Sequence, residues 1–261
     1  MLTALVSAKG SPGVTTLALA MFNAWPGRAL LVGADPAGDD LRQMLTGLDH
    51  GDGLLRLAAD RVPVATAVWE EALALDPGTQ QRLALFGIRS PAQARSLVNV
   101  WEPLGRQLRA MSADGLDVIA DTGRYAVAHS PTGLLKNADR VLVCTRGQLW
   151  SLDAAAALIR TLHDGGVTRR AVRLVVIGPT AYAPGELAAA GGVDAAVLPG
   201  VPLDDRTAER LRAGLVDARA GGKLLRATRQ LLVALTEEWK QDVRVESVEL
   251  EEVVNAHAVD R

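Results

Sequence analysis

Residues 9–16 read Lys9-Gly10-Ser11-Pro12-Gly13-Val14-Thr15-Thr16, and they join an apolar run over residues 2–6 to a helical pattern over residues 17–25. A strand, a glycine-bearing loop and a helix start are the arrangement that a phosphate-binding loop requires. Gly10 and Gly13 let the backbone curl so that successive N–H groups point inward, and the helix N-terminus adds its partial positive charge. Residues 9–16 therefore predict an anion-binding site at the start of the first helix.

Two positions decide what this loop offers to a bound phosphate. Thr15 stands where a hydroxyl holds Mg²⁺ in phosphate-binding loops, and Thr16 is suited to cap the first turn of the helix. The lysine expected immediately before the two threonines is replaced by Val14. The loop therefore keeps its magnesium group and lacks its main positive charge.

These residues resemble the ParA/MinD family of deviant phosphate-loop ATPases, whose pattern is Lys-Gly-Gly-x-Gly-Lys-Thr-Thr. Lys9 matches the family's early signature lysine, and the chain departs from the pattern at Ser11 and Val14. The resemblance implies that residues 9–16 bind ATP or ADP together with Mg²⁺. It also implies a homodimer, because in the family the signature lysine reaches the nucleotide of the partner. The alternative is that Lys9 is a surface lysine beside a turn.

The composition is that of an ordinary globular chain. Its 261 residues, 49% hydrophobic and 22% charged, are enough for one large α/β domain. The net charge of -2 and the isoelectric point of about 6.1 give no overall electrostatic case for binding nucleic acid. The single cysteine, Cys144, can form no internal disulfide, and no apolar run approaches the roughly 18 residues of a membrane span. We therefore expect a cytoplasmic protein without membrane insertion.

Strand-like and helical segments alternate along the chain. Strand-like runs are expected at residues 29–32, 116–123, 138–145 and 172–177, with helical patterns between them. This alternation predicts a doubly wound α/β fold, in which helices cover both faces of a mostly parallel sheet. The family resemblance covers residues 1–240 and implies the same P-loop NTPase-like fold, so we assign that range to one domain.

One long helical pattern, over residues 91–111, is expected to pack on the core. The apolar face of this pattern carries Ala94, Leu97, Val98, Trp101, Leu104 and Leu108. Trp69 and Trp101 are both assigned to the core, with a surface for a partner as the alternative.

An aspartate follows the strand-like run at 29–32, at the carboxyl edge of the sheet where open α/β folds bind ligands. The segment resembles the family's Asp-x-Asp-Pro-x-Gly motif, in which Asp35 takes the second position and Gly33 replaces the first aspartate. The resemblance assigns Asp35 a catalytic role, that of orienting the attacking water. The alternative is a plain turn in which Asp39 or Asp40 caps a helix.

A second aspartate, Asp121, closes the apolar run that begins at residue 116. A carboxylate at this place suits the binding of a water molecule held by Mg²⁺. Its segment resembles the family's Walker B motif, Asp-Thr-x-x. We therefore predict that Asp121 serves catalysis and, together with Thr15, the metal.

Two arginines follow strands at the same edge and are candidates for the missing charge of the loop. Arg124 comes after the strand of Asp121, and Arg146 comes after the strand of Cys144; the alternative is that both are surface arginines. Residues 197–205 resemble the family's loop beside the base. The asparagine that family members often carry for adenine after the strand at 172–177 is absent.

Late in the chain, two helical patterns at residues 206–213 and 223–239 concentrate basic side chains: Arg206, Arg210, Arg212, Arg219, Arg226 and Arg229. Some ParA-like proteins bind DNA nonspecifically through basic residues in this region. The favoured interpretation is a solvated helix face whose arginines are balanced by neighbouring carboxylates.

The last segment, residues 241–261, is expected to form a strand or an acidic tail. Residues 243–250 alternate like an edge strand, and four glutamates follow one another closely: Glu246, Glu249, Glu251 and Glu252. These charges would be repelled by anionic lipid, which argues against a membrane-binding helix of the MinD type. A tail for a protein partner is the remaining interpretation.

The residues and the resemblance together favour a degenerate family member that binds ATP weakly and hydrolyses it slowly or not at all. Such a protein would position or scaffold a cellular assembly such as a pilus or secretion machine, as the TadZ/CpaE proteins with altered phosphate loops do. The alternative is an active partition ATPase that segregates DNA cargo.

Overall fold

A computed structural model describes residues 1–9, 12–47, 53–59, 63–76, 78–125, 128–180, 182–214 and 221–259, with the backbone alone at 184 and 246–259. Within these ranges one eight-stranded sheet has the order β3-β4-β2-β5-β1-β6-β7-β8. All neighbouring strands are parallel except β3 and β4. The strands are β1 (Leu2–Ser7), β2 (Ala29–Gly33), β3 (Leu73–Ala74), β4 (Arg82–Leu85), β5 (Asp117–Arg124), β6 (Arg140–Thr145), β7 (Val172–Val176) and β8 (Ala196–Val197). The predicted doubly wound α/β fold is confirmed.

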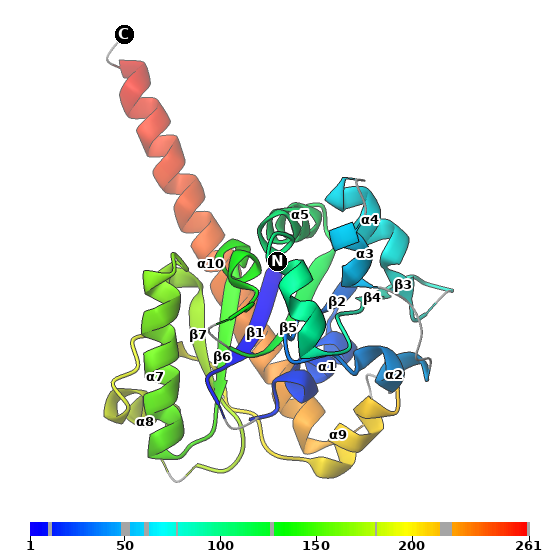
Figure 1. Cartoon of the computed structure of the whole chain (residues 1–261). Coiled ribbons are helices and arrows are strands. Elements are labelled where there is room, and N and C mark those ends of the chain that lie inside the picture. The colour runs from blue at the N-terminus through cyan, green and yellow to red at the C-terminus, as the bar shows by residue number, and fades with distance from the viewer. Residues whose placement is uncertain are drawn as a thin grey trace.

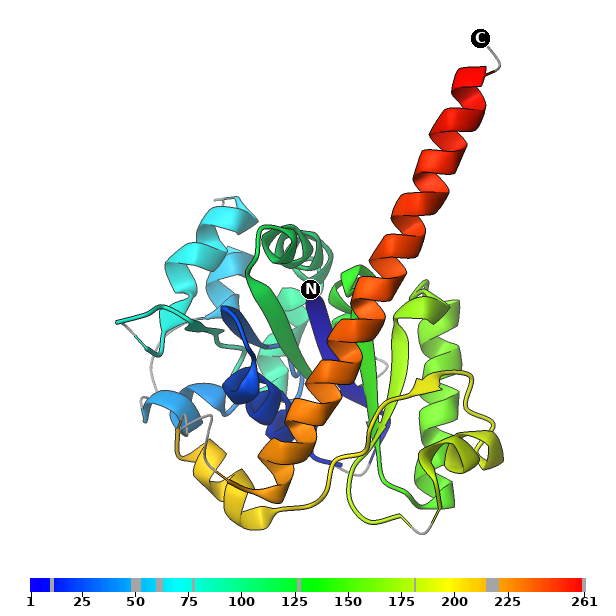
Figure 2. The ribbon, with the colours of Figure 1, turned by 180° about the vertical axis from the view of Figure 1, so that it is seen from behind.

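Helices cover both faces of the sheet (Figure 1). The described helices are α1 (Val14–Ala24), α2 (Leu41–Thr46), α3 (Leu54–Ala59), α4 (Val64–Glu71), η1 (Pro91–Leu97), α5 (Trp101–Ala113), α6 (Thr132–Asn137), α7 (Leu149–Asp164), η2 (Arg169–Ala171), α8 (Pro184–Ala190), α9 (Asp205–Arg212) and α10 (Lys223–Val259). Helices α1, α9 and α10 share one apolar cluster, and α3 to α8 share the other. Figure 2 shows α10 lying across the sheet, on the side turned away in Figure 1.

Strand β1 is buried along its whole length, because it lies between β5 and β6 at the centre of the sheet. Its side chains alternate between the two clusters, with Leu2, Ala4 and Val6 on one face and Leu5 on the other. A strand covered on both faces reads as a continuous apolar run, which is the pattern of residues 2–6. The central strand therefore ends at the predicted anion loop.

The expectation of a strand at 243–250 is wrong. These residues continue α10, which runs to Val259 and projects beyond the globular body (Figures 1 and 2). Between residues 223 and 259 the sequence has no glycine or proline to end a helix, so local alternation was the weaker signal. Residues 260 and 261 lie outside the described ranges.

Ion pairs hold the middle of α10 against the sheet. Arg140, buried at the start of β6, pairs with Asp242, and its guanidinium lies 5.3 Å from the centre of the Trp239 ring. Arg173 of β7 donates from Nε to Glu238 over 2.6 Å. The helix therefore packs on the domain across residue 240, where the sequence suggested a division.

Two residues that were assigned to the core, Val98 and Trp69, are exposed. Val98 is 48% exposed, because η1 is a tighter helix that ends at Leu97 and the α-helical phase begins again at Trp101. Trp101 is buried as predicted, whereas Trp69 on α4 is 49% exposed. Among the described helices, none combines the length and apolar character needed to cross a membrane.

Candidate functional site

Within the predicted phosphate loop, Gly13 has a backbone conformation that glycine adopts readily. Gly13 caps α1 in the left-handed region, with φ of +113°, and its carbonyl accepts the N–H of Leu17 over 2.9 Å. Lys9 is exposed after the end of β1, whereas Pro12 is buried just before the cap. Gly10 and Ser11 lie outside the described residues. The end of β1 and the start of α1 therefore lie on the two sides of the predicted anion site.

Val14 belongs to the hydrophobic core. Its side chain is 6% exposed and packs in the cluster formed by α1, α9 and α10. A valine at this position contributes apolar contacts and no charge. The substitution read from the sequence is therefore built into the packing of the domain.

Beside the loop, the structure brings together the three polar residues predicted for magnesium and water. Thr15, Asp35 and Asp121 line one hollow of about 390 Å³ at the carboxyl edge of β2 and β5. Asp121 is 3% exposed and accepts a hydrogen bond from the N–H of Gly123 over 3.1 Å. The nearby hydroxyl of Thr15 interacts with the same carboxyl and lowers its pKa. The structure therefore brings together the three groups that the sequence predicted for magnesium and water.

Burial raises the pKa values of the carboxyl groups in this hollow. Loss of hydration raises the pKa of Asp121 to about 7, and the nearby carboxyls of Asp39 and Asp35 add to the effect. Burial likewise raises the pKa of Asp35, against the opposing hydrogen bond from the N–H of Ala37. A positive charge placed among these carboxyls would favour their ionised forms.

Asp39 is a member of this hollow that the sequence assigned only to helix capping. Its Oδ1 accepts the N–H of Leu41 at the start of α2, and its Oδ2 accepts the N–H of Gly87, each over 2.7 Å. A Cβ at Gly33 would overlap Oδ2 of Asp39. Asp39 therefore occupies the space of a side chain at position 33, where the family pattern has its first aspartate. Burial raises the pKa of Asp39 to about 6.

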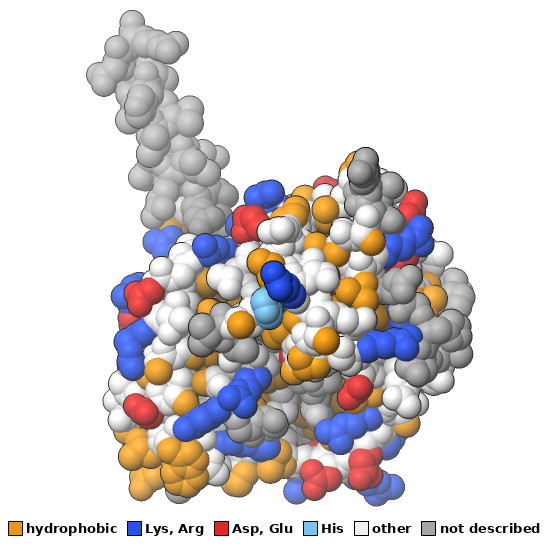
Figure 3. All heavy atoms as spheres, viewed as in Figure 1, with side chains coloured by type: hydrophobic (Ala, Val, Ile, Leu, Met, Phe, Trp, Pro, Cys, Tyr) orange, Lys and Arg blue, Asp and Glu red, His pale blue; other side chains and the backbone are white. Residues whose placement is uncertain are grey.

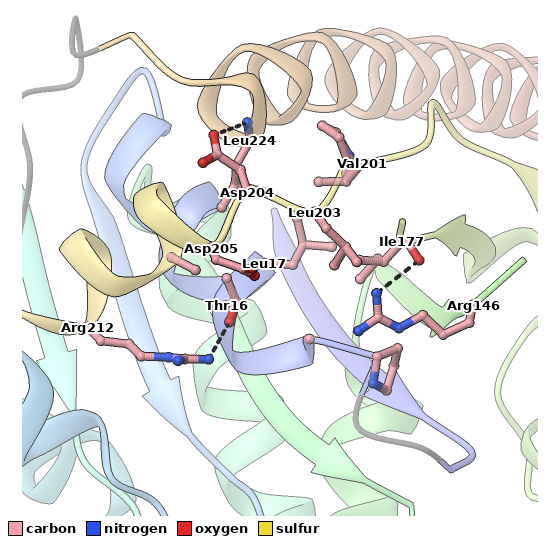
Figure 4. A pocket seen from close by; sticks show the side chains of 14 residues that line it. Thr16, Leu17, Arg146, Ile177, Val201, Leu203, Asp204, Asp205, Arg212 and Leu224 are labelled. Atoms are coloured by element: carbon pink, nitrogen blue, oxygen red, sulfur yellow. Dashed lines mark hydrogen bonds between the residues drawn. The ribbon is translucent and has the colours of Figure 1, made fainter. Parts of the chain in front are cut away.

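A second hollow, of about 150 Å³, opens on the other side of the start of α1 (Figure 4). Arg146 enters it from the end of β6, and its Nη1 lies 3.4 Å from the carbonyl oxygen of Ile177. The loop predicted beside the base supplies Val201, Pro202 and Leu203 to the wall. Its wall also carries Arg212 and the carboxyls of Asp204 and Asp205. Apolar walls with two arginines next to a helix N-terminus suit a nucleoside phosphate.

The two arginines proposed from the sequence do not lie together. Arg146 lines the hollow beside α1, whereas Arg124 lines a separate cavity of about 510 Å³ with Pro36, Tyr125 and His129. Of the late arginines, Arg212 comes to the start of α1, where Nη2 lies 3.4 Å from Oγ1 of Thr16. The sequence pattern gave no signal for this contact, because 196 residues separate the two partners.

The acidic hollow suits Mg²⁺ bound to a ligand better than Mg²⁺ bound by protein alone. Among the described side chains, no group of three or more His, Cys, Asp or Glu residues has the arrangement to hold a metal ion. Magnesium usually takes one or two carboxylates, waters and phosphate oxygens. Thr15 and Asp121 fit that incomplete set.

Comparison of the sequence with protein-family models and with curated proteins finds no match. Comparison of the fold finds MinD cell division protein of Aquifex aeolicus, with a TM-score of 0.67 and 15% identity over 90% of this chain and 96% of that chain. The chain has the fold of the MinD and ParA ATPases. A ParA family ATPase of Chlorobium tepidum gives a TM-score of 0.65 and 18% identity, covering 87% and 96% of the two chains. The septum site-determining protein MinD of Pyrococcus horikoshii, complexed with Mg-ADP, gives 0.64 and 17%, covering 88% and 93%.

Proposed function

We propose that the chain is a degenerate MinD/ParA-type protein that binds ATP or ADP with Mg²⁺ weakly and hydrolyses ATP slowly or not at all. The observation that carries this proposal is the pairing of an intact Thr15–Asp121 contact with a Val14 side chain buried in the core. The first supports a magnesium–nucleotide site, and the second removes the charge that a lysine supplies to the phosphates. The protein would then position or scaffold an assembly, and the binding of nucleotide, rather than its hydrolysis, would switch the protein between states.

The chain's own residues define the chemistry that remains. Thr15 and Asp121 would hold Mg²⁺, which supplies positive charge to the phosphate oxygens when it is bound. Asp35, on the same hollow, would accept a proton from water or orient it. Phosphoryl transfer depends on position and electrostatic stabilisation, so the loss of a lysine contact lowers the rate directly.

We propose a two-fold homodimer as the assembled form. Lys9 is exposed next to the loop, as a residue that reaches a partner's nucleotide must be. Leu149 and Trp150, at the start of α7, are 63% and 66% exposed and lie at the same sheet edge as the loop, which supports a second copy of the chain on this face. Light scattering with and without MgATP, on wild type and Lys9→Ala, tests it. A wild-type monomer in every condition contradicts the dimer.

Phosphate release measured with and without DNA separates the proposal from an active partition ATPase. Arg206, Arg210, Arg212 and Arg226 are exposed on α9 and α10, and Arg219 lies outside the described residues. Basic and acidic side chains are interspersed over α9 in Figure 3, which favours a solvated helix face over a DNA-binding surface. We expect slow turnover or none, without stimulation by DNA. Turnover that DNA stimulates would replace the scaffold by the partition ATPase.

A further inference from the structure

We infer that Arg212 supplies to bound phosphates the positive charge that Val14 lacks, a role that rests on the proposed nucleotide site. The charge would come from the last residue of α9 instead of from the loop. Arg212 reaches over the first turn of α1, where Nη2 lies 3.4 Å from Oγ1 of Thr16 (Figure 4). Its side chain is otherwise exposed and is therefore accessible to a ligand.

The position of Arg212 relative to the two hollows carries the inference. One hollow contains Thr16 and Arg146 beside apolar walls, and the other contains Thr15 and Asp121. Of the described residues, Arg212 alone lines both. A nucleotide whose base side enters the first hollow and whose magnesium lies in the second must pass its phosphates between them. Arg212 stands at that crossing point.

The helix that carries Arg212 is fixed at both ends. Asp204 caps α9 by accepting the N–H of Thr207 over 3.1 Å, and it also accepts the N–H of Leu224 at the start of α10 over 3.3 Å. Leu211, next to Arg212, is 1% exposed in the cluster that contains α1. Helix α9 is therefore held in place by its packing, and it places the guanidinium of Arg212 beside α1.

The chemistry of arginine suits this role. A guanidinium stays charged and offers several donors in a planar fork that matches two phosphate oxygens at once. A bound magnesium–phosphate group would sit between Arg212 and the acidic wall of the second hollow. The competing explanation is a surface arginine that merely stabilises the C-terminal end of α9, a property that Arg210 shares.

Calorimetry of wild type, Arg212→Ala, Arg212→Lys and the matched control Arg210→Ala, each with MgADP and with adenosine, tests the inference. We expect Arg212→Ala to weaken MgADP binding about 10- to 100-fold, and Arg212→Lys to recover part of the loss. Arg210→Ala should bind MgADP like wild type, and adenosine should bind all four proteins alike. Melting temperatures measured without ligand check that all four are folded.

Wild-type binding of MgADP that Arg212→Ala leaves unchanged overturns the role of Arg212 and spares the proposed nucleotide site. An equal loss for Arg210→Ala, or an equal loss for adenosine, also overturns it, because the effect would then not be local to the phosphates. Wild type that binds neither MgATP nor MgADP overturns the nucleotide site and this inference together.

Discussion

The carboxylate of Asp39 fills the space above Gly33. A Cβ at Gly33 would overlap Oδ2 of Asp39 and lie 2.9 Å from the backbone nitrogen of Gly87. The same Oδ2 accepts the N–H of Gly87 over 2.7 Å, so the contact is part of the hydrogen bonding that closes the loop after β2. An acidic group therefore lies beside the site although position 33 itself is a glycine.

Gly33→Ala should lower the free energy of unfolding by about 1–3 kcal/mol, because the methyl group displaces Asp39 and crowds Gly87. Asp39→Ala should also destabilise, since it leaves the half-buried N–H of Gly87 without its acceptor. The double variant should lose less than the sum, by about 0.5 kcal/mol or more. Urea unfolding of the four proteins measures this. Strictly additive losses would show that the two residues do not compete for the same space.

The stability of the ligand-free protein should fall as pH rises from about 5 to about 8. Asp39 and Asp121 have pKa values of about 6 and about 7 in the folded state, above their ordinary value of 3.8, so the folded state holds protons that the unfolded state has released. Their stabilising contribution is therefore present at low pH and lost as pH passes the folded values. The two carboxyls lie close together and do not titrate independently. The total loss of stability is therefore smaller than the sum of two separate titrations, and we expect it to be of the order of 2 kcal/mol.

Asp121→Asn is the control for this pH dependence. An asparagine keeps an acceptor for Thr15 and Gly123 and cannot ionise, so the variant should show a flatter curve and should be at least as stable as wild type at pH 8. Chemical unfolding across the pH range measures both proteins. Identical pH profiles would contradict the assignment to Asp121.

Asp242→Ala should lower the free energy of unfolding by about 2–4 kcal/mol, because it leaves the buried guanidinium of Arg140 without its carboxylate. Gln241→Ala, an exposed position on the same turn of α10, should change stability by less than about 0.5 kcal/mol. Thermal unfolding measures both variants. If Asp242→Ala changes stability as little as Gln241→Ala does, the ion pair beyond residue 240 does not stabilise the domain.

Val14→Lys should bind MgATP about 10- to 100-fold more tightly than wild type, because the ammonium restores a charged contact to the phosphates. Without ligand it should be less stable by about 1–3 kcal/mol, since Val14 is 6% exposed in the core. Val14→Met fills the site without charge and should leave affinity unchanged. If both variants bind MgATP equally, charge is not what the loop lacks. Tighter binding without turnover would make Gly33, which carries no carboxylate, the next position to test.

The alternation of strands and helices, and the residues at the carboxyl edge of the sheet, could be predicted from the sequence. The apolar run 2–6, the glycine loop and the helix start predicted where α1 begins, and the parallel sheet placed Asp35 and Asp121 at one hollow. Contacts between distant segments were not readable. Nothing near Thr16 in the sequence indicates Arg212, and the role of Asp39 depends on a loop that folds back over Gly33.

Local periodicity failed where a longer element set the conformation. Residues 243–250 alternate, yet they extend a helix that begins at Lys223 and meets no breaking residue. Val98 follows a helical pattern whose phase shifts between η1 and α5. In both places the decisive information lies outside the window in which the pattern was read.

Titration calorimetry with millimolar MgATP is the decisive test of a weak magnesium–nucleotide site at the start of α1. We expect a saturable heat and a higher melting temperature in MgATP, with both effects reduced by Thr15→Ala. Thr15→Ala is the appropriate variant because it removes the hydroxyl that interacts with Asp121. Thr15 is not part of the core cluster that contains Val14, so the core packing is kept. If wild type gives no heat and no thermal shift at millimolar MgATP, the chain has no magnesium–nucleotide site at this place.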